Sequence, residues 1–132
     1  MIWWTGYPSH KIDTVWATAL PMLRRGFEGP ELADDYYDKC RTGQAQLWCV
    51  LDDTKIIASL LTEIITIDSK KVCNVLSIGG HGSKDWLQFI KIIEQWAQSN
   101  ECAAMRYANC RKGWARLLKD YQTIRIVLEK VL

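Results

Sequence analysis

Three glycines stand at the junction between a segment typical of a strand and a segment typical of a helix. Residues 72–78 are mostly apolar and rich in β-branched side chains, which favours an extended strand. After Ser83, a residue type preferred at helix N-caps, apolar side chains recur at helical spacing through residues 84–100. The junction therefore predicts a strand that enters a helix through a glycine turn.

This junction, with the sequence SIGGHGS at residues 77–83, is also a candidate phosphate-binding loop. Glycine allows positive φ angles and close approach of a ligand, and the N–H groups that begin the following helix favour an anion such as pyrophosphate. The loop matches neither GxxxxGK(S/T) nor GxGxxG, which argues against an ordinary nucleotide site. The alternative is a turn that needs glycine only for its geometry.

The chain has 132 residues, enough for one domain with a hydrophobic core and too few for two, so we expect a single domain over residues 1–132. Hydrophobic residues make up 48% and charged residues 24%, which is typical of a soluble globular protein and argues against a disordered chain. The net charge is +2 and the basic residues are spread along the sequence. Neither nucleic acid nor a membrane surface is therefore expected as a partner.

The five cysteines are scattered, with no CxxC pair and only two histidines that could join them as ligands. This pattern argues against a structural metal site and a disulfide framework, and it indicates reduced thiols in a cytosolic compartment. No window is long and apolar enough to span a membrane, and the first residues lack the features of a signal peptide. We therefore expect no metal, no membrane segment and a cytoplasmic location.

Periodicity and turn residues divide the chain into strands and helices. From residue 44 onward, polar turns separate three strand-like segments that predict an antiparallel meander, and the long middle one lacks clean alternation, which predicts a bulge or bend. A helix separates the third of these strands from the next, so that pair is expected to be parallel through a right-handed crossover. Pro21 is expected to bend or divide the first helix. We expect strands at residues 1–7, 47–51, 56–67, 72–78, 101–109 and 123–132, and helices at residues 9–25, 31–40, 84–100 and 111–120.

The expected fold class is α+β, with a central mixed, mostly antiparallel sheet of about six strands flanked by about four helices, in the order (β)ααβββαβαβ. This order, with the glycine loop between the fourth strand and the third helix, resembles the GNAT acetyltransferase superfamily. Members of that superfamily bind acetyl-CoA through a loop of pattern (Q/R)-x-x-G-x-(G/A). Gly80 and Gly82 fit both glycine positions, whereas Ser77 replaces the Gln or Arg that begins the pattern.

Residues 111–121 carry a second resemblance, to small GNAT-like proteins encoded by tailed bacteriophages. In those proteins a segment like the one here, with Arg111, Gly113, Trp114 and Arg116, closes the domain. Asp120 stands where that segment has glycine. The resemblance implies a phage source, a location in the host cytoplasm or the virion, and a phage or host protein as a further partner.

The GNAT resemblance also implies where a cofactor binds. In the superfamily, the strand before the loop diverges from the next parallel strand, its backbone holds the pantetheine arm of CoA, and loop N–H groups hold the pyrophosphate. Transferred to this chain, residues 73–78 line the arm and the loop surrounds the phosphates. For His81 and Lys84 the alternatives are an exposed loop residue and a solvated helix residue. The implied cofactor-binding residues are Val75, Leu76, Ser77, Ile78, Gly79, Gly80, His81, Gly82, Ser83 and Lys84.

Acetyl transfer to an amine needs a base and an acid, and the sequence offers few candidates. Glu63 is the candidate base, because desolvation within an apolar strand raises the pKa of a carboxylate. The alternative is a carboxylate that faces solvent or forms an ion pair. Many family members carry a tyrosine about seven residues after the asparagine that ends the strand, but here counting from Asn109 reaches Arg116. Tyr107 and Tyr121 lie nearby without matching that position.

Other reactive or aromatic residues have simpler interpretations. Cys73 and Cys110 are expected to be buried, inert thiols, because no histidine lies near them in sequence. Trp86 and Trp96 are expected in the core. Trp114, which follows a glycine and lies between two arginines, is either another core residue or the wall of a groove.

Three hypotheses for function follow. The first is an acyltransferase that moves the acetyl group of acetyl-CoA to an unidentified amine or protein acceptor. The second is a non-catalytic GNAT-fold phage protein that acts as a virion or host-interaction component. The third is a CoA-binding module without transfer activity. Ser77 and Arg116 at the motif positions argue against catalysis, whereas Gly80 and Gly82 argue for a bound cofactor.

Overall fold

Five strands form one sheet in the computed structural model, which describes residues 2–26, 30–107, 112–124 and 128–132. Neighbouring strands from the first to the fourth are antiparallel, whereas the fifth is parallel to the fourth. The predicted meander and the predicted parallel crossover are therefore both present. In their order along the sheet, the strands are β1 (Ile2–Tyr7), β2 (Ala45–Asp52), β3 (Lys55–Ile67), β4 (Lys70–Gly80) and β5 (Ala104–Tyr107).

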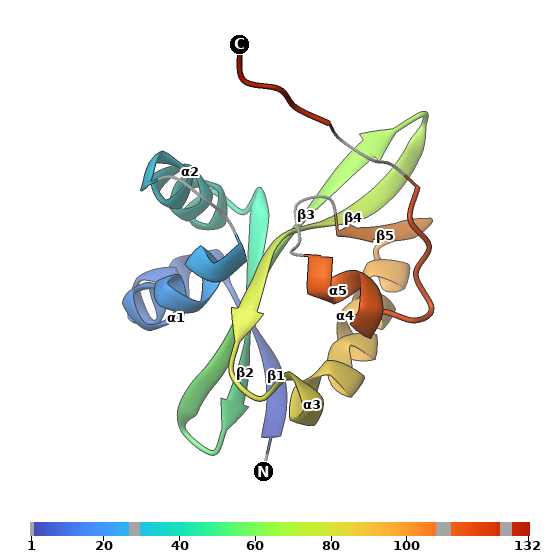
Figure 1. Ribbon diagram of the computed structural model, residues 1–132. Coiled ribbons are helices and arrows are strands. Elements are labelled where there is room, and N and C mark those ends of the chain that lie inside the picture. The colour runs from blue at the N-terminus through green and yellow to red at the C-terminus, as the bar shows by residue number, and fades with distance from the viewer. Residues whose placement is uncertain (1, 27–29, 108–111, 125–127) are drawn as a thin grey trace.

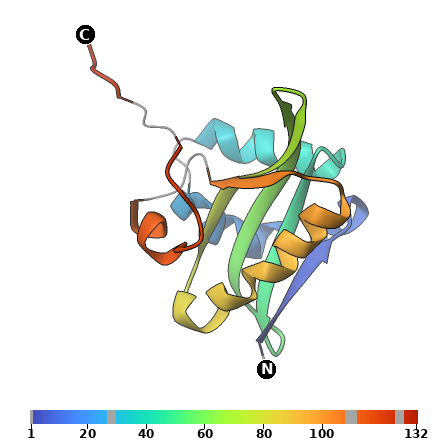
Figure 2. The same cartoon turned by 90° about the vertical axis from the view of Figure 1, so that its right-hand side faces the viewer.

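Helices cover both faces of this sheet (Figures 1 and 2). In chain order the helical elements are the 3₁₀ helix η1 (Ser9–Thr14), α1 (Trp16–Leu23), the 3₁₀ helix η2 (Arg24–Gly26), α2 (Pro30–Arg41), α3 (Ser83–Trp86), the 3₁₀ helix η3 (Leu87–Ile90), α4 (Lys91–Ser99) and α5 (Lys112–Leu117). Helices α1 and α2 lie on one face, and α3, α4 and α5 lie on the other. The expected α+β class is confirmed.

Each face of the sheet has its own hydrophobic core. Trp86 and Ile93 belong to the core beneath α3 and α4, and Leu23 and Tyr36 belong to the core beneath α1 and α2. Leu60 and Leu61, successive residues of β3, belong to different cores, because neighbouring side chains of a strand point to opposite faces. This double burial explains why the sequence of β3 lacks clean alternation of apolar and polar residues.

The first and third predicted helices are interrupted. Residues 9–25 divide at Val15, whose φ of −128° and ψ of −11° lie outside the helical region, and not at Pro21, which lies inside α1. Helix α1 therefore tolerates the loss of the one backbone hydrogen bond that proline cannot donate. Residues 84–100 form α3, η3 and α4 in succession, so the segment is helical but changes from α-helix to 3₁₀ helix at residues 87–90.

The predicted sixth strand is absent from the described residues. Residues 121–124 and 128–132 lie outside the sheet. A strand pattern is a local property, but a strand also needs a hydrogen-bonding neighbour, and within the described chain β5 pairs only with β4. The strand predicted at residues 101–109 is shorter as well, because Glu101 has a positive φ of 65° and the strand begins at Ala104.

Two irregularities bend the central strands. In the β2–β3 pair the register shifts so that Ile57 is the extra residue, which confirms the bulge predicted for this strand. In the β3–β4 pair, Leu61 lies opposite Ser77 and Thr62 lies opposite Val75, so Leu76 is the extra residue of β4. The second bulge lies four residues before the end of β4, where the strand approaches the glycine loop.

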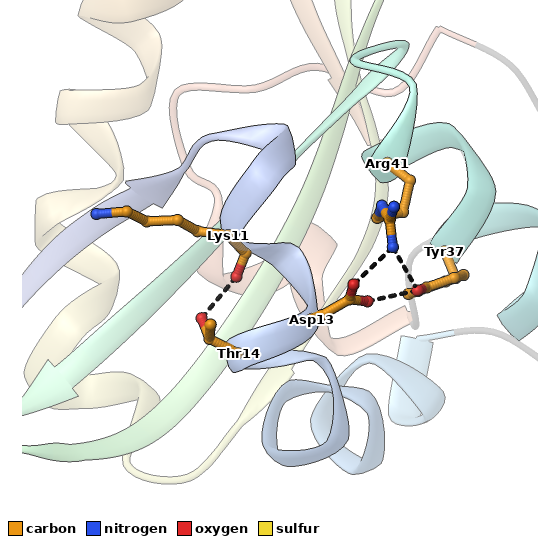
Figure 3. A network of polar contacts seen from close by, with 5 residues as sticks. All are labelled: Lys11, Asp13, Thr14, Tyr37 and Arg41. Carbon is orange, nitrogen blue, oxygen red and sulfur yellow. Dashed lines mark hydrogen bonds and ion pairs between the residues drawn. The ribbon is translucent and has the colours of Figure 1, made fainter.

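A polar network ties η1 to α2 (Figure 3). Arg41 Nη1 donates to Asp13 Oδ2 at 2.6 Å and to Tyr37 Oη at 3.0 Å, and Tyr37 Oη donates to Asp13 Oδ1. Within η1, Thr14 Oγ1 donates to the Lys11 carbonyl at 2.6 Å. The network lies on the α1 and α2 face and holds α2 against the segment that follows β1.

Candidate functional site

The glycine loop begins where β4 passes closest to β3. A Cβ atom on Gly80 would lie 2.4 Å from Ala58 Cβ and 2.5 Å from the Ile57 carbonyl oxygen, so packing alone excludes any other residue there. Gly82 has a φ of 69°, which places it in the left-handed region that favours glycine. Packing therefore requires glycine at position 80, and the backbone favours glycine at position 82, whether or not a ligand binds.

Hydrogen bonds within the protein fix the loop backbone. The His81 N–H donates to the Ile57 carbonyl at 2.8 Å, and the His81 carbonyl accepts from Trp86 Nε1 at 2.8 Å. The Asp85 N–H donates to the Gly82 carbonyl at 2.9 Å, which closes the turn into α3. The loop is thus held from both sides, by β3 and by the helical segment, and the His81 N–H is already engaged.

Arg25 brings a positive charge to this loop. Its Nη1 atom donates to the Gly80 carbonyl at 3.1 Å, and its guanidinium nitrogens lie 3.5 and 3.4 Å from Nδ1 and Nε2 of His81. Both side chains are exposed. One carboxylate opposes them in part, because Asp85 Oδ2 lies 3.3 Å from the position of a Cβ on Gly82.

Sequence reasoning missed Arg25. The contact joins residues 55 positions apart, and η2, which carries Arg25, precedes the entire meander. One local signal existed: Gly26 follows the arginine, and a Cβ there would lie 2.4 Å from Ser77 Oγ. A glycine after two arginines could have indicated that this basic segment packs closely against another backbone.

Strands β4 and β5 part before the loop. Their parallel pairing runs from Val72–Ala104 to Val75–Tyr107, and β4 continues for five more residues to Gly80. From Leu76 to Gly80, the β5 side of β4 has no strand neighbour among the described residues. This parting begins at the Leu76 bulge and ends at the loop, and along it one side of β4 has no β-ladder partner among the described residues.

The residues predicted to line the pantetheine arm are buried by the protein itself. Val75 and Ile78 belong to the core beneath α4, and Leu76 belongs to the core beneath α1 and α2. Ser77 is also buried, and its Oγ donates to the Leu23 carbonyl at 2.6 Å. Any contact with an arm along this stretch would therefore come from backbone N–H and C=O groups. The Ser77 side chain faces α1 and η2, where a longer Gln or Arg would collide with Gly26.

Glu63 forms an ion pair with α2. Its Oε2 atom accepts from Lys39 Nζ at 3.2 Å, with side-chain exposed fractions of 16% for Glu63 and 30% for Lys39. The ion pair that the sequence left open as an alternative is therefore present. Glu63 lies opposite Asn74, and five residues of extended strand, about 16 Å, separate that position from Gly79.

Two tyrosines meet where β4 and β5 part. The Tyr107 and Tyr121 rings contact edge to face with centroids 5.1 Å apart, and Tyr121 Oη donates to Glu94 Oε2 at 2.7 Å. Burial raises the pKa of both phenols; the hydrogen bond to Glu94 raises that of Tyr121 further. Tyr107 lies opposite Val75, one residue before the bulge, and keeps its proton at neutral pH. It is a candidate acid that no sequence motif identified.

The remaining predictions concern cysteines and tryptophans. Cys73 is buried, and burial raises the pKa of its thiol to about 12, so the predicted inert thiol is confirmed. Trp86 is buried, and the Trp114 ring lies 6.0 Å from it and packs against the same core together with Trp96, which favours the core interpretation of Trp114. The side chains of Ser83 and Lys84, and the residues Asn109, Cys110 and Arg111, lie outside the described part of the chain.

The described residues contain neither a cluster of metal-binding side chains nor a membrane-spanning helix. No three side chains of His, Cys, Asp or Glu there are grouped so that they could hold a metal ion. Within the same part of the chain, no helix has the length and apolar character needed to cross a bilayer.

Comparison with known proteins gives matches in structure alone. No protein-family model and no curated protein matches the sequence. A predicted acetyltransferase with acetyl-CoA from Clostridium acetobutylicum superposes with a TM-score of 0.71 at 13% identity, covering 99% of this chain and 96% of that one. Glucosamine-6-phosphate N-acetyltransferase from Arabidopsis thaliana gives 0.70 at 11%, with 99% and 98% covered.

A third match comes from Staphylococcus aureus. This GNAT family acetyltransferase gives a TM-score of 0.68 at 14% identity, with coverage of 99% of this chain and 98% of that one. At such low identities the likeness establishes the fold. The chain therefore has the GNAT fold along nearly its whole length.

Proposed function

We propose that this chain binds acetyl-CoA and transfers the acetyl group to an amine. The observation that carries the proposal is the parting of β4 from β5 at Leu76, which leads directly to a loop bordered by Arg25 and His81. Strand backbone without a ladder partner on one side suits the amide groups of a pantetheine arm, and a cationic loop suits pyrophosphate. One structural neighbour is described as a complex with acetyl-CoA, which supports acetyl-CoA as the cofactor of this proposal.

In this proposal the cofactor lies along the end of β4. The backbone from Val75 to Ile78 holds the arm, and the loop from Gly79 to Lys84 surrounds the pyrophosphate together with Arg25. The guanidinium of Arg25 is already oriented by the Gly80 carbonyl, so it meets an anion with little loss of side-chain freedom. The bound thioester supplies an activated acetyl group.

The protein's own groups then handle the protons. Tyr107 lies where the strands part and is protonated, so it is placed to donate a hydrogen bond to the sulfur of the leaving thiolate. Glu63 remains the candidate base, and its ion pair with Lys39 holds its carboxylate on the α2 face. The acceptor amine would then approach between α2 and the strand bulge.

A CoA-binding protein without transfer activity is the second candidate. The observation that favours it is the ion pair between Glu63 and Lys39, which engages the best base candidate that the sequence offered. Arg116, exposed on α5, also stands where many relatives carry tyrosine. The resemblance to small bacteriophage proteins fits this candidate, with a virion or host protein as the partner.

Thiol release from acetyl-CoA separates the two candidates. The purified protein is incubated with acetyl-CoA and a panel of polyamines, aminoglycosides, amino sugars and peptide amines, and free CoA is measured. We expect acceptor-dependent release that Glu63→Gln lowers far more than it lowers CoA affinity. Saturable CoA binding without CoA release for any acceptor would favour the second candidate, a CoA-binding protein without transfer activity. An equal fall in turnover and CoA affinity in Glu63→Gln would indicate a structural role for Glu63.

A further inference from the structure

Lys39 differs from the other lysines whose exposure the structure describes. Its Nζ atom lies 3.2 Å from Glu63 Oε2, and the exposed fraction of its side chain is 30%. Its position on α2 is half-buried, whereas the other described lysines are exposed: Lys11, Lys55, Lys70, Lys71, Lys91, Lys119 and Lys130. Lys39 is therefore a half-buried amine that is held against the candidate base.

The ion pair lies at the level where β4 and β5 part. Glu63 lies opposite Asn74 of β4, and Asn74 lies opposite Arg106 of β5. The next pair, Val75 with Tyr107, is the last one that joins β4 to β5 in the described chain. Glu63 is thus one residue away from the parting, and Lys39 reaches it from the face that α2 covers (Figure 1).

The proposed placement of acetyl-CoA brings its thioester to the same level. With the pyrophosphate at the loop, the arm runs along β4 from Gly79 towards Asn74, over five residues of extended strand or about 16 Å. An extended pantetheine arm has a comparable length, so its sulfur reaches the parting of β4 from β5. The Lys39 amine then stands on the side from which the acceptor of the proposed reaction approaches.

The chemistry of the pair suits acyl transfer. An ammonium must lose a proton before its nitrogen can attack a carbonyl carbon, and Glu63 Oε2 lies within hydrogen-bond distance of that proton. An amine of the same chain also needs no separate binding step, which favours it over an amine in solution.

We propose that Lys39 is an internal acetyl acceptor, which the protein modifies with its own bound acetyl-CoA. Glu63 takes one proton from the Lys39 ammonium, the nitrogen bonds to the thioester carbonyl carbon, and the carbon–sulfur bond breaks. The leaving sulfur takes a second proton from the nitrogen, and Glu63 later releases its proton to water, so the products are acetyl-lysine, CoA thiol and one proton. This inference rests on the acetyl-CoA binding proposed above. Acetylation removes the charge of Lys39 and with it the ion pair, which leaves Glu63 available to an external amine.

Peptide mapping by mass spectrometry tests the modification. The purified protein is incubated with acetyl-CoA and no added acceptor, and acetylation is followed at each lysine. We expect Lys39 to be acetylated at least tenfold faster than the exposed Lys55 and Lys91, at a rate per chain that does not depend on protein concentration. Acetyl phosphate, an acetyl donor without the CoA portion, should reverse this preference, because exposed amines are then the more accessible ones.

Two variants separate catalysis from simple reactivity. Glu63→Gln should slow the acetylation of Lys39 about a hundredfold and leave that of the exposed lysines unchanged, because it removes the base and keeps the size of the side chain. Lys39→Arg keeps a cation beside Glu63 but offers no acetylatable amine, so only the slow modification of exposed lysines should remain. Thermal melting checks that both variants fold.

Three results overturn the proposal: acetylation of Lys39 no faster than that of Lys55, a rate per chain that rises with protein concentration, or an unchanged rate in Glu63→Gln. A parallel calorimetric titration distinguishes this failure from failure of the proposed function. Saturable acetyl-CoA binding with an unmodified Lys39 overturns self-acetylation and leaves the cofactor site in place, whereas the absence of binding overturns both.

Discussion

Arg25 is the residue that most changes the electrostatics of the glycine loop. It reaches the loop from η2, donates to the Gly80 carbonyl and lies against the His81 ring. A guanidinium has five N–H donors, so one that already donates to a carbonyl has donors left for a phosphate. Gly80, by contrast, is required for packing against β3. Variants at Gly80 would therefore disturb that packing before their effect on CoA binding could be measured.

Arg25→Gln should weaken acetyl-CoA binding by about ten- to a hundredfold, because it removes a charge-assisted contact with phosphate. Calorimetric titration at two salt concentrations measures the effect, and the loss should shrink at high salt. Arg24→Gln is the matched control, since Arg24 is an exposed neighbour on the same short helix. Equal weakening in both variants would mean that only the net charge matters.

Tyr107→Phe should lower turnover by about a hundredfold while leaving CoA affinity unchanged, because it removes a hydrogen-bond donor to the leaving sulfur and keeps the ring contact with Tyr121. Steady-state kinetics with the best acceptor, beside a binding titration, measure both quantities. Tyr121→Phe serves as the control, since it deletes the hydrogen bond to Glu94 and keeps the ring contact with Tyr107. If turnover survives in Tyr107→Phe, another group stabilises the leaving thiolate.

At the scale of elements, the sequence predicted features that depend on neighbouring residues and missed those that depend on contacts between distant residues. The strand, glycine turn and helical segment follow from spacing and glycine content, and the parallel placement of β5 follows from the intervening helix. The break at Val15 was misplaced to Pro21 because one missing hydrogen bond does not stop a helix. The prediction of a sixth strand failed because alternation of apolar and polar residues does not show whether a strand has a hydrogen-bonding neighbour. Arg25 was missed because the meander of β2, β3 and β4 separates it in sequence from the loop that it contacts.

The loop itself can be tested at Gly82, where φ is positive and a Cβ would approach only Asp85 Oδ2. Gly82→Asp should reduce CoA affinity at least tenfold, since Asp tolerates this backbone region and places a negative charge beside the phosphates. Gly82→Asn is the matched control, with the same shape and no charge, and it should lose much less. Thermal melting checks that both variants fold. Identical affinities in the two variants would remove electrostatics from the role of the loop.

At the scale of the whole molecule, two cores enclose the sheet and bury thiols within it. Cys40 and Cys49 lie in the core beneath α1 and α2, and Cys73 on β4 is also fully covered. Burial raises the pKa of these thiols to about 12, about 11 and about 12, respectively, from an ordinary value of 9.0. The native state therefore keeps three protons that the unfolded chain releases in alkali.

The free energy of unfolding should fall as the pH rises from about 9 towards 11, on the order of 1 kcal/mol per pH unit for each thiol. A raised pKa in the folded state means that this part of the stability is complete below pH 9 and is lost above it. Urea unfolding at a series of pH values measures the slope. Cys73→Ala should flatten the slope. A slope that is the same in the wild-type and variant proteins would contradict the account of the buried thiols.

The measurement that bears most directly on the whole account is a calorimetric titration of acetyl-CoA into the wild-type protein, with thermal melting alongside. If β4, the loop and Arg25 form a CoA site, binding saturates with a micromolar dissociation constant, and the melting temperature rises with ligand concentration, because a ligand specific for the folded state stabilises it. No heat of binding and no melting shift at millimolar CoA would contradict the account and leave a GNAT-shaped scaffold without its cofactor.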